Sequence, residues 1–393
     1  MNKKLGLAVA GALVAFSSAA NAGITIPAGD WTVDIGGNVN AYYTNVQKDV
    51  TNGAGVKTSA NDANTIGTGL LPAAFGIGAK TRQNDLDIAF QFSFFTGTSA
   101  GGVGAAGGNN TLNIRQAFLT FGDASWGTIK AGRDLGIFGS DAILSDMTLL
   151  GVGVGGPSGG SSTLGRIGSG YIYADWKGQI SYASPNWNGF SVAAGVMEGF
   201  NNGQQDMGYE AKATYDFAAN DVTGRVWLGG LTQKTEGATS YTSRGVEIGA
   251  KAAFQGFGLV GYYYDGRGLD GQTTTAAATA TDQNPGINGT NGLFNAGGQK
   301  TKDSGGYVQA TFVVPGIGTK LGASYGVSNT KADAGFDIEN NSWIIGAYHP
   351  LTKSLNLVAE YTNQEIKNSN AGVSDTKAKV ESDTISLGAI LFF

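Results

Sequence analysis

The last eleven residues of the chain, Asp383 to Phe393, read D-T-I-S-L-G-A-I-L-F-F and alternate between two faces. Counted back from the end, one face is apolar: Phe393, Leu391, Ala389, Leu387 and Ile385. The other face is smaller and more polar away from the end: Phe392, Ile390, Gly388, Ser386 and Thr384. A period of two predicts a β-strand. An outward apolar side with a terminal aromatic is typical of a transmembrane barrel, whose wall faces lipid around a wet lumen. The alternative is the closing strand of a soluble sandwich.

The N-terminus has the pattern of a secretory signal peptide. Lys3 and Lys4 precede an apolar run over residues 5–16, and Ala20-Asn21-Ala22 supplies an A-x-A cleavage site. We therefore expect residues 1–22 to be removed, so that the mature protein begins at Gly23. The apolar run is too short to span a membrane, and no later stretch has about 20 consecutive apolar residues. The mature chain keeps 23 of the 25 basic residues against 30 acidic ones, a net charge near −7.

The composition narrows the class of protein further. None of the 393 residues is cysteine, so we expect neither disulfide bonds nor a lipid-modified cysteine. Glycine accounts for 65 residues, aromatic residues for 10% and charged residues for 14%. A disordered chain would have more charge and fewer aromatic residues, and collagen would show a strict glycine period. Because no linker divides the mature chain, we expect residues 23–393 to form one all-β transmembrane antiparallel barrel.

Alternation recurs along the chain, for example in Trp31–Tyr43 and Asp85–Phe95. The connections between such segments alternate in length. The short ones are residues 82–84, 185–189, 218–221, 315–316 and 350–354. The long ones are roughly residues 47–69, 97–110, 135–165, 200–208, 234–242, 267–304, 330–340 and 367–382. Short periplasmic turns at one rim and long extracellular loops at the other are typical of outer-membrane barrels. Counting the strands between these connections predicts sixteen.

One long connection, residues 135–165, differs from an ordinary surface loop. Its first half is rich in apolar residues: Leu135, Ile137, Phe138, Ile143, Leu144, Met147, Leu149 and Leu150. A loop packed against the inside of a barrel must bury one side, whereas an extracellular loop has no such need. Asp134, Asp141 and Asp146 interrupt the run, and we expect them to point toward the remaining opening. The Gly-rich segment 151–165 would return the backbone to the rim. A surface loop with incidental apolar residues is the alternative.

Four motifs resemble those of the Gram-negative general diffusion porins. Residues 128–153, beginning T-I-K-A-G-R-D, are similar to the fifth strand and the inward-folded third loop of that family. R-Q-A-F-L at residues 115–119 resembles the start of its fourth strand, and G-R-I-G at 165–168 resembles the motif that re-enters the wall. Y-A-S-P-N-W-N-G-F at 182–190 resembles one of its turns. With the signal peptide and Phe393, the likeness spans the whole mature chain.

This resemblance implies the function and the partners of the protein. It implies an outer-membrane channel for the passive diffusion of small hydrophilic solutes and ions, with an eyelet formed by the third loop. It also implies a homotrimer embedded in lipid and lipopolysaccharide. A terminal aromatic such as Phe393 is the residue that the outer-membrane assembly machinery recognises in this family. The main competing function is a substrate-specific porin for organic anions or sugars.

Strand parity and the resemblance together predict the charges at the eyelet. Arg115 shares a strand face with Leu119, which we assign to the lumen, and Tyr171 is expected to point outward, which places Arg166 inward. The resemblance implies that arginines at these two positions face the acids of the loop. The predicted pore constriction comprises Arg115, Arg166, Asp134, Asp141 and Asp146. Charges facing each other across a narrow channel create a transverse field. The alternative is a pair of rim arginines that contact lipid phosphates.

Other charged residues are placed by the same parity. Arg133 falls on the outer face, where it would anchor the loop or contact another subunit, whereas Lys80 and Lys130 fall on the lumenal face. Three positions that are often charged in the enteric relatives are uncharged in this chain: Leu150, Asn38 and Ala74. The eyelet is therefore expected to be less charged than theirs, and the sign of its ion selectivity is left open.

Residue counts argue against an enzyme. A barrel lipase needs a Ser–His pair, and the only histidine, His349, adjoins Pro350 in an expected periplasmic turn. One histidine without cysteine cannot assemble a metal cluster, and the Gly motifs lack the strand–helix context of a phosphate loop. We expect no cofactor, no metal and no nucleic-acid partner. The aromatic run Tyr262–Tyr264 alternates faces, and we expect it to belong to an interfacial girdle.

Overall fold

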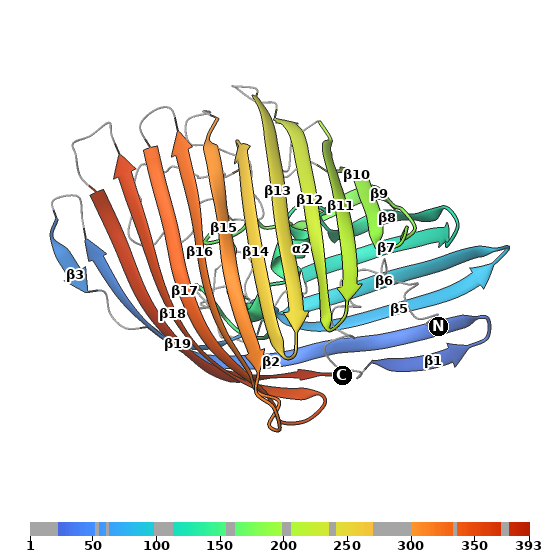
Figure 1. Ribbon diagram of the computed structural model, residues 1–393, viewed down its shortest axis with the longest axis horizontal. Helices are drawn as coiled ribbons and strands as arrows, with labels where there is room; N and C mark the ends of the chain where they lie inside the picture. Colours follow the sequence, from blue (N-terminus) through green and yellow to red (C-terminus); the bar gives the residue numbers. More distant parts are fainter. Residues whose placement is uncertain are drawn as a thin grey trace.

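The computed structural model describes residues 23–51, 55–59, 63–97, 113–154, 162–198, 206–235, 241–269, 300–332, 336–370 and 377–393. The expected signal peptide, residues 1–22, lies outside the described residues. The described segments form one strongly curved antiparallel sheet with two short helices on its inner side (Figure 1). These helices lack the length and the apolar character that a helix needs to cross a membrane.

Nineteen strands belong to this sheet, and sixteen of them close into a barrel. The ring runs through β2 and then from β5 to β19 in chain order, and it closes where β19 pairs with β2. The short strands β1, β3 and β4 pair with the long strand β2. The predicted sixteen-stranded antiparallel barrel is confirmed.

The first strands are β1 (Ile24–Ala28), β2 (Trp31–Thr51), β3 (Lys57–Ser59), β4 (Ala63–Gly67), β5 (Ala73–Gln83), β6 (Leu86–Thr96), β7 (Asn113–Asp123) and β8 (Gly127–Leu135). The strands that follow are β9 (Trp176–Ala183), β10 (Phe190–Met197), β11 (Gly208–Ala219), β12 (Val222–Thr235), β13 (Tyr241–Phe254) and β14 (Phe257–Arg267). The last are β15 (Lys302–Val313), β16 (Lys320–Ala332), β17 (Phe336–Pro350), β18 (Leu355–Asn370) and β19 (Lys377–Phe392).

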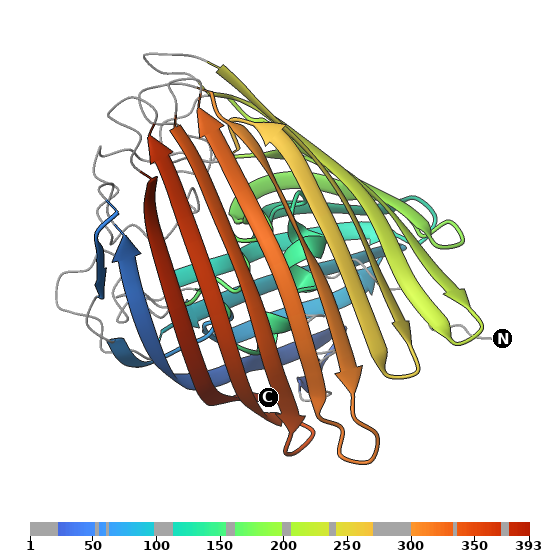
Figure 2. The ribbon, with the colours of Figure 1, turned by 60° about the vertical axis from the view of Figure 1, so that its left-hand side comes forward.

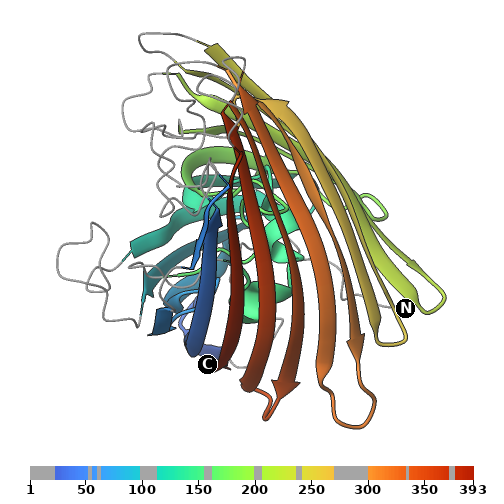
Figure 3. The same ribbon diagram turned by 90° about the vertical axis from the view of Figure 1, so that its left-hand side faces the viewer.

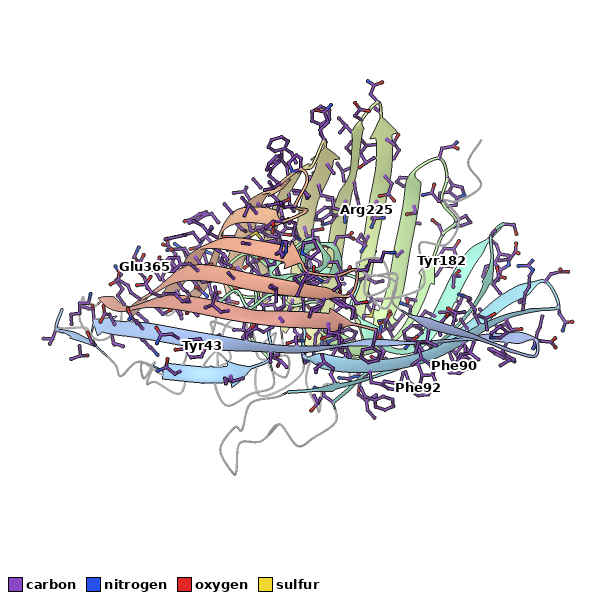
Figure 4. The ribbon with its side chains drawn as sticks, turned by 90° about the horizontal axis from the view of Figure 1, so that it is seen from below. Tyr43, Phe90, Phe92, Tyr182, Arg225 and Glu365 are labelled. Atoms are coloured by element: carbon purple, nitrogen blue, oxygen red, sulfur yellow. The ribbon has the colours of Figure 1, made fainter. Side chains whose placement is uncertain are left out.

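Exposure alternates along each wall strand and divides the sheet into two faces. On β19 the outward residues Ile385 and Leu387 are 48% and 52% exposed, whereas Thr384 and Ser386 are buried on the inner face. Phe90 and Phe92 protrude from the outer face of β6 in the same way (Figure 4). An apolar outer face suits contact with lipid, and the closed ring pairs the backbone groups that lipid could not satisfy. The predicted apolar outer face of the last strand is confirmed.

Short turns and long connections alternate around the barrel. The turn between β13 and β14 lies at the lower end of the barrel in Figure 2. It is one of three two-residue turns, which join β5 to β6, β11 to β12 and β13 to β14. Their residues Asn84, Asp85, Asn220 and Gln255 have positive φ, as tight hairpin turns require. The connections at the other end are longer, for example residues 97–112 between β6 and β7 and residues 268–301 between β14 and β15. The predicted alternation of lengths is confirmed.

The chain terminus lies at the seam of the barrel. Leu391 and Phe392 pair with Val39 and Asn38 of β2, as the last strand must do to close the ring. The terminal residue continues this pairing, because Gly37 N–H donates to the Phe393 carbonyl at 2.9 Å and Phe393 N–H donates to the Gly37 carbonyl at 3.1 Å. Phe393 therefore completes the pairing between the last strand and the first.

Deletion of Phe393 is expected to reduce assembly more than permeation. The deletion removes both hydrogen bonds to Gly37 at the seam but touches no group inside the barrel. The fraction that migrates as a folded barrel in unheated gels should fall several-fold, while the conductance of each remaining channel stays unchanged. Ile317→Ser is the control, since Ile317 is an exposed residue of the turn between β15 and β16, which is separated from the seam by other strands. An unchanged folded fraction would contradict the assigned role of Phe393.

Candidate functional site

Between β8 and β9 the chain leaves the wall and lies inside the barrel. This segment, residues 136–175, contains helix α2 (Ser140–Leu144) and the 3₁₀ helix η1 (Met147–Leu150), and its residues 155–161 lie outside the described part. We call it the inner loop. In Figures 1, 2 and 3, α2 lies between the strands on opposite sides of the barrel. The segment was expected to end near residue 165, but the wall resumes only at Trp176.

Three glutamates of the wall, Glu210 on β11, Glu247 on β13 and Glu360 on β18, bind the backbone of the inner loop. We call them the wall glutamates, and each is at most 4% exposed. The bonds run from Ile137 N–H (2.6 Å) and Phe138 N–H (2.9 Å) to Glu210, from Gly139 N–H (2.9 Å) to Glu247, and from Val152 N–H and Gly153 N–H (both 2.8 Å) to Glu360. Hydrogen bonds to a charged acceptor are about twice as strong as neutral ones.

Each wall glutamate has a further donor inside the barrel. Glu210 pairs with the buried Lys177 ammonium at 2.5 Å. The other two accept from tyrosine hydroxyls, Tyr262 to Glu247 at 2.8 Å and Tyr348 to Glu360 at 2.7 Å. These donors compensate in part for the loss of water around the buried carboxylates. Parity alone had suggested that Glu210 faces the lumen, but no sequence motif marked the wall glutamates as a set.

Neutral groups of the wall continue the attachment between these carboxylates. Their bonds are Tyr307 hydroxyl to Ala142 carbonyl (2.7 Å), Met147 N–H to the Gln309 side-chain carbonyl (2.7 Å), Tyr42 hydroxyl to Leu150 carbonyl (2.7 Å) and Leu70 N–H to Gly151 carbonyl (2.9 Å). Leu70 lies in the break between β4 and β5, where the wall backbone meets the loop. The inner loop is therefore held along an arc of the wall from β11 to the β4–β5 break.

Apolar packing fixes the same arc. Phe138, Ile143 and Tyr171 of the inner loop are buried against wall residues that include Trp227 and Tyr262. Burying one such side chain contributes on the order of 1.5–3 kcal/mol. The run Tyr262–Tyr264 was expected in an interfacial girdle, and this is wrong for two of its members. Tyr262 and Tyr264 point inward and are buried, and only Tyr263 lies outside, 52% exposed.

Arg166 lies in the inner loop and is fully buried. Its guanidinium donates to the hydroxyl and carbonyl of Ser324 on β16, both at 2.5 Å, and to the hydroxyl of Ser342 on β17 at 3.0 Å. The wall residue at position 326, next to this contact, has to be glycine. A Cβ at Gly326 would lie 2.2 Å from the Ser169 carbonyl oxygen. Arg166 thus attaches the loop to the wall. The sequence predicted that Arg166 faces the loop acids across an opening, and the structure does not show this arrangement.

Asp146 also serves the structure of the inner loop. One carboxylate oxygen accepts from Thr148 N–H at 2.9 Å and caps η1. The other accepts from Arg166 N–H at 3.1 Å and from the Tyr171 hydroxyl at 2.7 Å. Asp146 is only 3% exposed, so it ties the two limbs of the loop together and does not point into open lumen. Tyr171, expected outward on a strand, is buried in the loop, which explains why the parity argument for Arg166 failed.

Arg115 lies at a β-bulge near the loop end of β7. The register between β6 and β7 shifts beside Phe94, and Arg115 has no partner across the ladder. Its guanidinium carbon is 4.7 Å from the ring centre of Phe95 and 5.9 Å from that of Trp176. Among the described residues, no ion pair joins Arg115 to an acid of the inner loop. The resemblance had implied a position opposite those acids.

The face assignment on β7 was wrong. Gln116, Phe118 and Thr120 are buried on the inner face, whereas Leu119 is 48% exposed on the outer face. The apolar Phe118 misled the parity argument, because it lies inside the barrel beneath the Lys130 ammonium, which is 4.9 Å from its ring centre.

The remaining predicted charges lie close to the wall. Asp134, at the end of β8, is buried, pairs with Lys130 and accepts from the Gln116 amide at 2.8 Å. Lys80 pairs with Asp34 at 3.1 Å, and both side chains are about half exposed. Arg133 is exposed. Lys130 and Asp134 point inward, so the alternation of β8 places Arg133 on the opposite, outer face, which is the side that the sequence predicted.

Asp141 on α2 forms the main charged contact between the inner loop and the wall. It accepts from the Lys212 ammonium of β11 at 2.5 Å and from the Arg225 guanidinium of β12 at 3.0 Å. Burial opposes the charge on Asp141, but Lys212 and then Arg225 outweigh it and hold the pKa below its ordinary value. Arg225 also binds Asp216 through two bonds of 2.6 and 2.8 Å. Asp141 therefore faces wall cations, but these are Lys212 and Arg225 and not the predicted Arg115 and Arg166.

Within the described segments, no three His, Cys, Asp or Glu side chains are grouped as metal ligands. His349 lies near the end of β17, with its Nδ1 at 2.9 Å from the Thr319 hydroxyl. A closed barrel with a loop fastened across its interior is instead the architecture of a diffusion channel.

The comparisons with known proteins identify the class. The family model described as Gram-negative porin matches residues 8–369, so the chain belongs to this family. The protein is an outer-membrane channel and not an enzyme. No curated protein matches the sequence.

Solved structures share the fold at low sequence identity. OmpT of Vibrio cholerae is 16% identical, with a TM-score of 0.59 over 94% of this chain and 100% of that chain. The outer-membrane channel DcaP of Acinetobacter baumannii is 15% identical, with a TM-score of 0.63 over 95% and 100%. The anion-selective porin from Comamonas acidovorans is 16% identical, with a TM-score of 0.57 over 92% and 100%.

Glu360→Ala is expected to loosen the inner loop. It leaves the N–H groups of Val152 and Gly153 without their acceptor, at a cost on the order of 1–3 kcal/mol for each buried donor. Single-channel records should show larger current fluctuations, and protease should cut the loop faster in the folded barrel. Glu339→Ala is the matched control, because this strand glutamate is partly exposed and its printed partners in the described segments are the wall residues Lys367 and Asn341. Wild-type noise and protection in Glu360→Ala would rule out the assigned role.

Proposed function

We propose that the protein is a general diffusion channel that passes small hydrophilic solutes and ions, with the inner loop narrowing the lumen. The observation that supports the proposal is the attachment of the described parts of the inner loop, residues 136–154 and 162–175, at many points along the inside of the wall. A segment fixed in this way reduces the free cross-section of the lumen at its own level. Such a channel discriminates by size first and by charge second.

The charged border of the proposed eyelet is centred on Asp141. Lys212 and Arg225 on the wall form ion pairs with Asp141 on the loop, and these pairs fix the oppositely charged groups in place. The other predicted constriction residues, Arg115, Arg166, Asp134 and Asp146, contribute by holding the strands and the loop that carry this border. Lys80 and Lys130 form ion pairs with Asp34 and Asp134 along the lumenal wall.

We also propose the setting in which this channel works. Membership of the porin family supports three further proposals: export with a signal peptide cleaved after residue 22, assembly through the terminal Phe393, and residence in a lipopolysaccharide-bearing membrane. A homotrimer is proposed because one structurally similar protein, OmpT of Vibrio cholerae, is described in a trimer form. The outer face of β5 to β7 supports subunit contact, since Phe75, Phe92, Ile114 and Leu119 are all more than 40% exposed there.

Liposome swelling with sugars of graded size tests the proposed function. The purified barrel should admit small sugars quickly, and the rate should decline smoothly as the solute approaches the width of the eyelet. Liposomes without protein give the baseline. A single sugar that enters far above the size trend would contradict general diffusion and would support a substrate-specific channel.

A further inference from the structure

Four cations lie side by side on the barrel wall, where β13 to β16 meet the long connections. They are Arg244, Arg267, Lys302 and Lys331, one on each strand, and all four are exposed. Strand pairing places Arg244 opposite Arg267, Arg267 opposite Lys302, and Lys302 opposite Lys331. Figure 1 shows these four strands next to one another in the wall. We call the four residues the basic row.

The basic row belongs to the outer face of the barrel. Side chains two residues apart on a strand share a face. By this alternation Arg244 lies on the same face as Val246, Arg267 on the same face as Tyr263, and Lys302 on the same face as Val308. These three apolar or aromatic side chains are all more than 50% exposed on the outside of the wall. The row therefore faces the surroundings of the barrel and not its lumen.

Such a row is unfavourable by itself. Directly opposite side chains in an antiparallel pair lie about 4.5–5.5 Å apart, and like charges at this separation destabilise the sheet. The same repulsion acts on Lys300, just before β15, because burial and then the charges of Arg244 and Arg267 lower the pKa of its ammonium group. Among the described residues, Asp265 is the only carboxylate on the outer faces of β13 to β16. An anion from outside the chain would relieve this repulsion.

The adjoining part of the outer face is arranged differently. Lys367 on β18 and Lys379 on β19 pair with the same carboxylate, that of Glu365, at 2.6 and 2.5 Å. Arg244 and Arg267 form no ion pair within the described segments. The excess of positive charge is therefore a local property of the wall at β13 to β16, even though the mature chain is acidic overall.

An apolar groove lies on the same strands, nearer to the short turns. Its floor lies six residues along the strand from the basic row, for example at Ala250 below Arg244 and at Gly261 below Arg267. Six residues of strand span roughly 20 Å. The groove has a volume of about 740 Å³. Small side chains form its floor and bulky exposed ones border it: Ala250, Gly261, Ala310 and Ala323, and then Leu259, Val308, Tyr325 and Trp343.

We propose that the basic row binds the phosphates of lipid A, the phosphorylated disaccharide lipid of lipopolysaccharide, on the outside of the barrel. Three strand spacings make the row about 14 Å long. A row of this length can contact phosphates at both ends of a disaccharide, whereas a phospholipid brings one phosphate. The acyl chains of the same molecule run along the outer faces of β13 to β16 and reach the groove, where they bury apolar surface. This inference rests on the proposed residence in a lipopolysaccharide-bearing membrane and adds the binding site.

Native mass spectrometry of the purified barrel in detergent tests the basic row. Titration with lipid A that carries both phosphates should give a lipid-bound wild-type barrel. The double variant Arg244→Gln/Arg267→Gln should bind this lipid about tenfold more weakly, because it loses two exposed charged contacts. Arg244→Lys/Arg267→Lys keeps the charges and should retain most of the affinity. If the neutral double variant does not assemble, Arg267→Gln alone should show about a threefold loss.

The double variant Lys367→Gln/Lys379→Gln is the matched control, because it removes two cations from the adjoining outer face. It should bind lipid A like the wild type. Equal losses in both neutral double variants would reduce the effect to net charge and overturn the site, and so would wild-type affinity in Arg244→Gln/Arg267→Gln.

The choice of lipid is tested by two further titrations of the wild type. Lipid A without phosphates should bind about tenfold more weakly than the bisphosphorylated form, and phosphatidylglycerol should not displace the latter at equal concentration. Equal binding of both forms of lipid A, or displacement by phosphatidylglycerol, would contradict the assignment. Cell fractionation tests the proposed location separately, since a wild-type protein absent from the outer membrane contradicts the location whatever it binds in detergent.

Discussion

The hydrogen bonds from the wall glutamates to the backbone of the inner loop are the interaction on which the rest of the structure depends. A segment inside a barrel has no strand beside it, so its N–H groups need other acceptors. Glu210, Glu247 and Glu360 supply them at three points along the arc. The carboxylates in turn tolerate burial because backbone, tyrosine and lysine donors surround them. Without these acceptors, N–H groups of the inner loop such as those of Ile137, Gly139 and Val152 would be buried without partners.

Pairing of charge determines the character of the lumen. Many charged side chains of the described lumenal face form ion pairs with the wall or the loop, including Asp141 with Lys212 and Lys80 with Asp34. Paired charges keep the surface hydrated and polar without holding a passing ion strongly, which suits a channel for many solutes.

The alternation of apolar and polar residues was sufficient to predict the wall, because every second side chain of a membrane-spanning strand faces lipid. The apolar loop was likewise predictable, but the wall cations that bind Asp141 are Lys212 and Arg225 and not the predicted arginines. Arg115 was misplaced because a β-bulge and the inward Phe118 disrupt the pattern on β7. Arg166 was misplaced because the loop continues to Trp176, so strand parity does not apply to it. The wall glutamates were missed as a set because their partners are backbone N–H groups, which no sequence pattern displays.

The single-channel conductance of a barrel that lacks Ser140–Leu150 tests the central claim most directly. These residues form α2 and η1, the part of the inner loop that is bound to β11, β12 and β15. If the fastened loop sets the aperture, the deletion variant should conduct more than the wild type in the same salt, provided that it still migrates as a folded barrel. A folded variant with wild-type conductance would show that the constriction lies elsewhere.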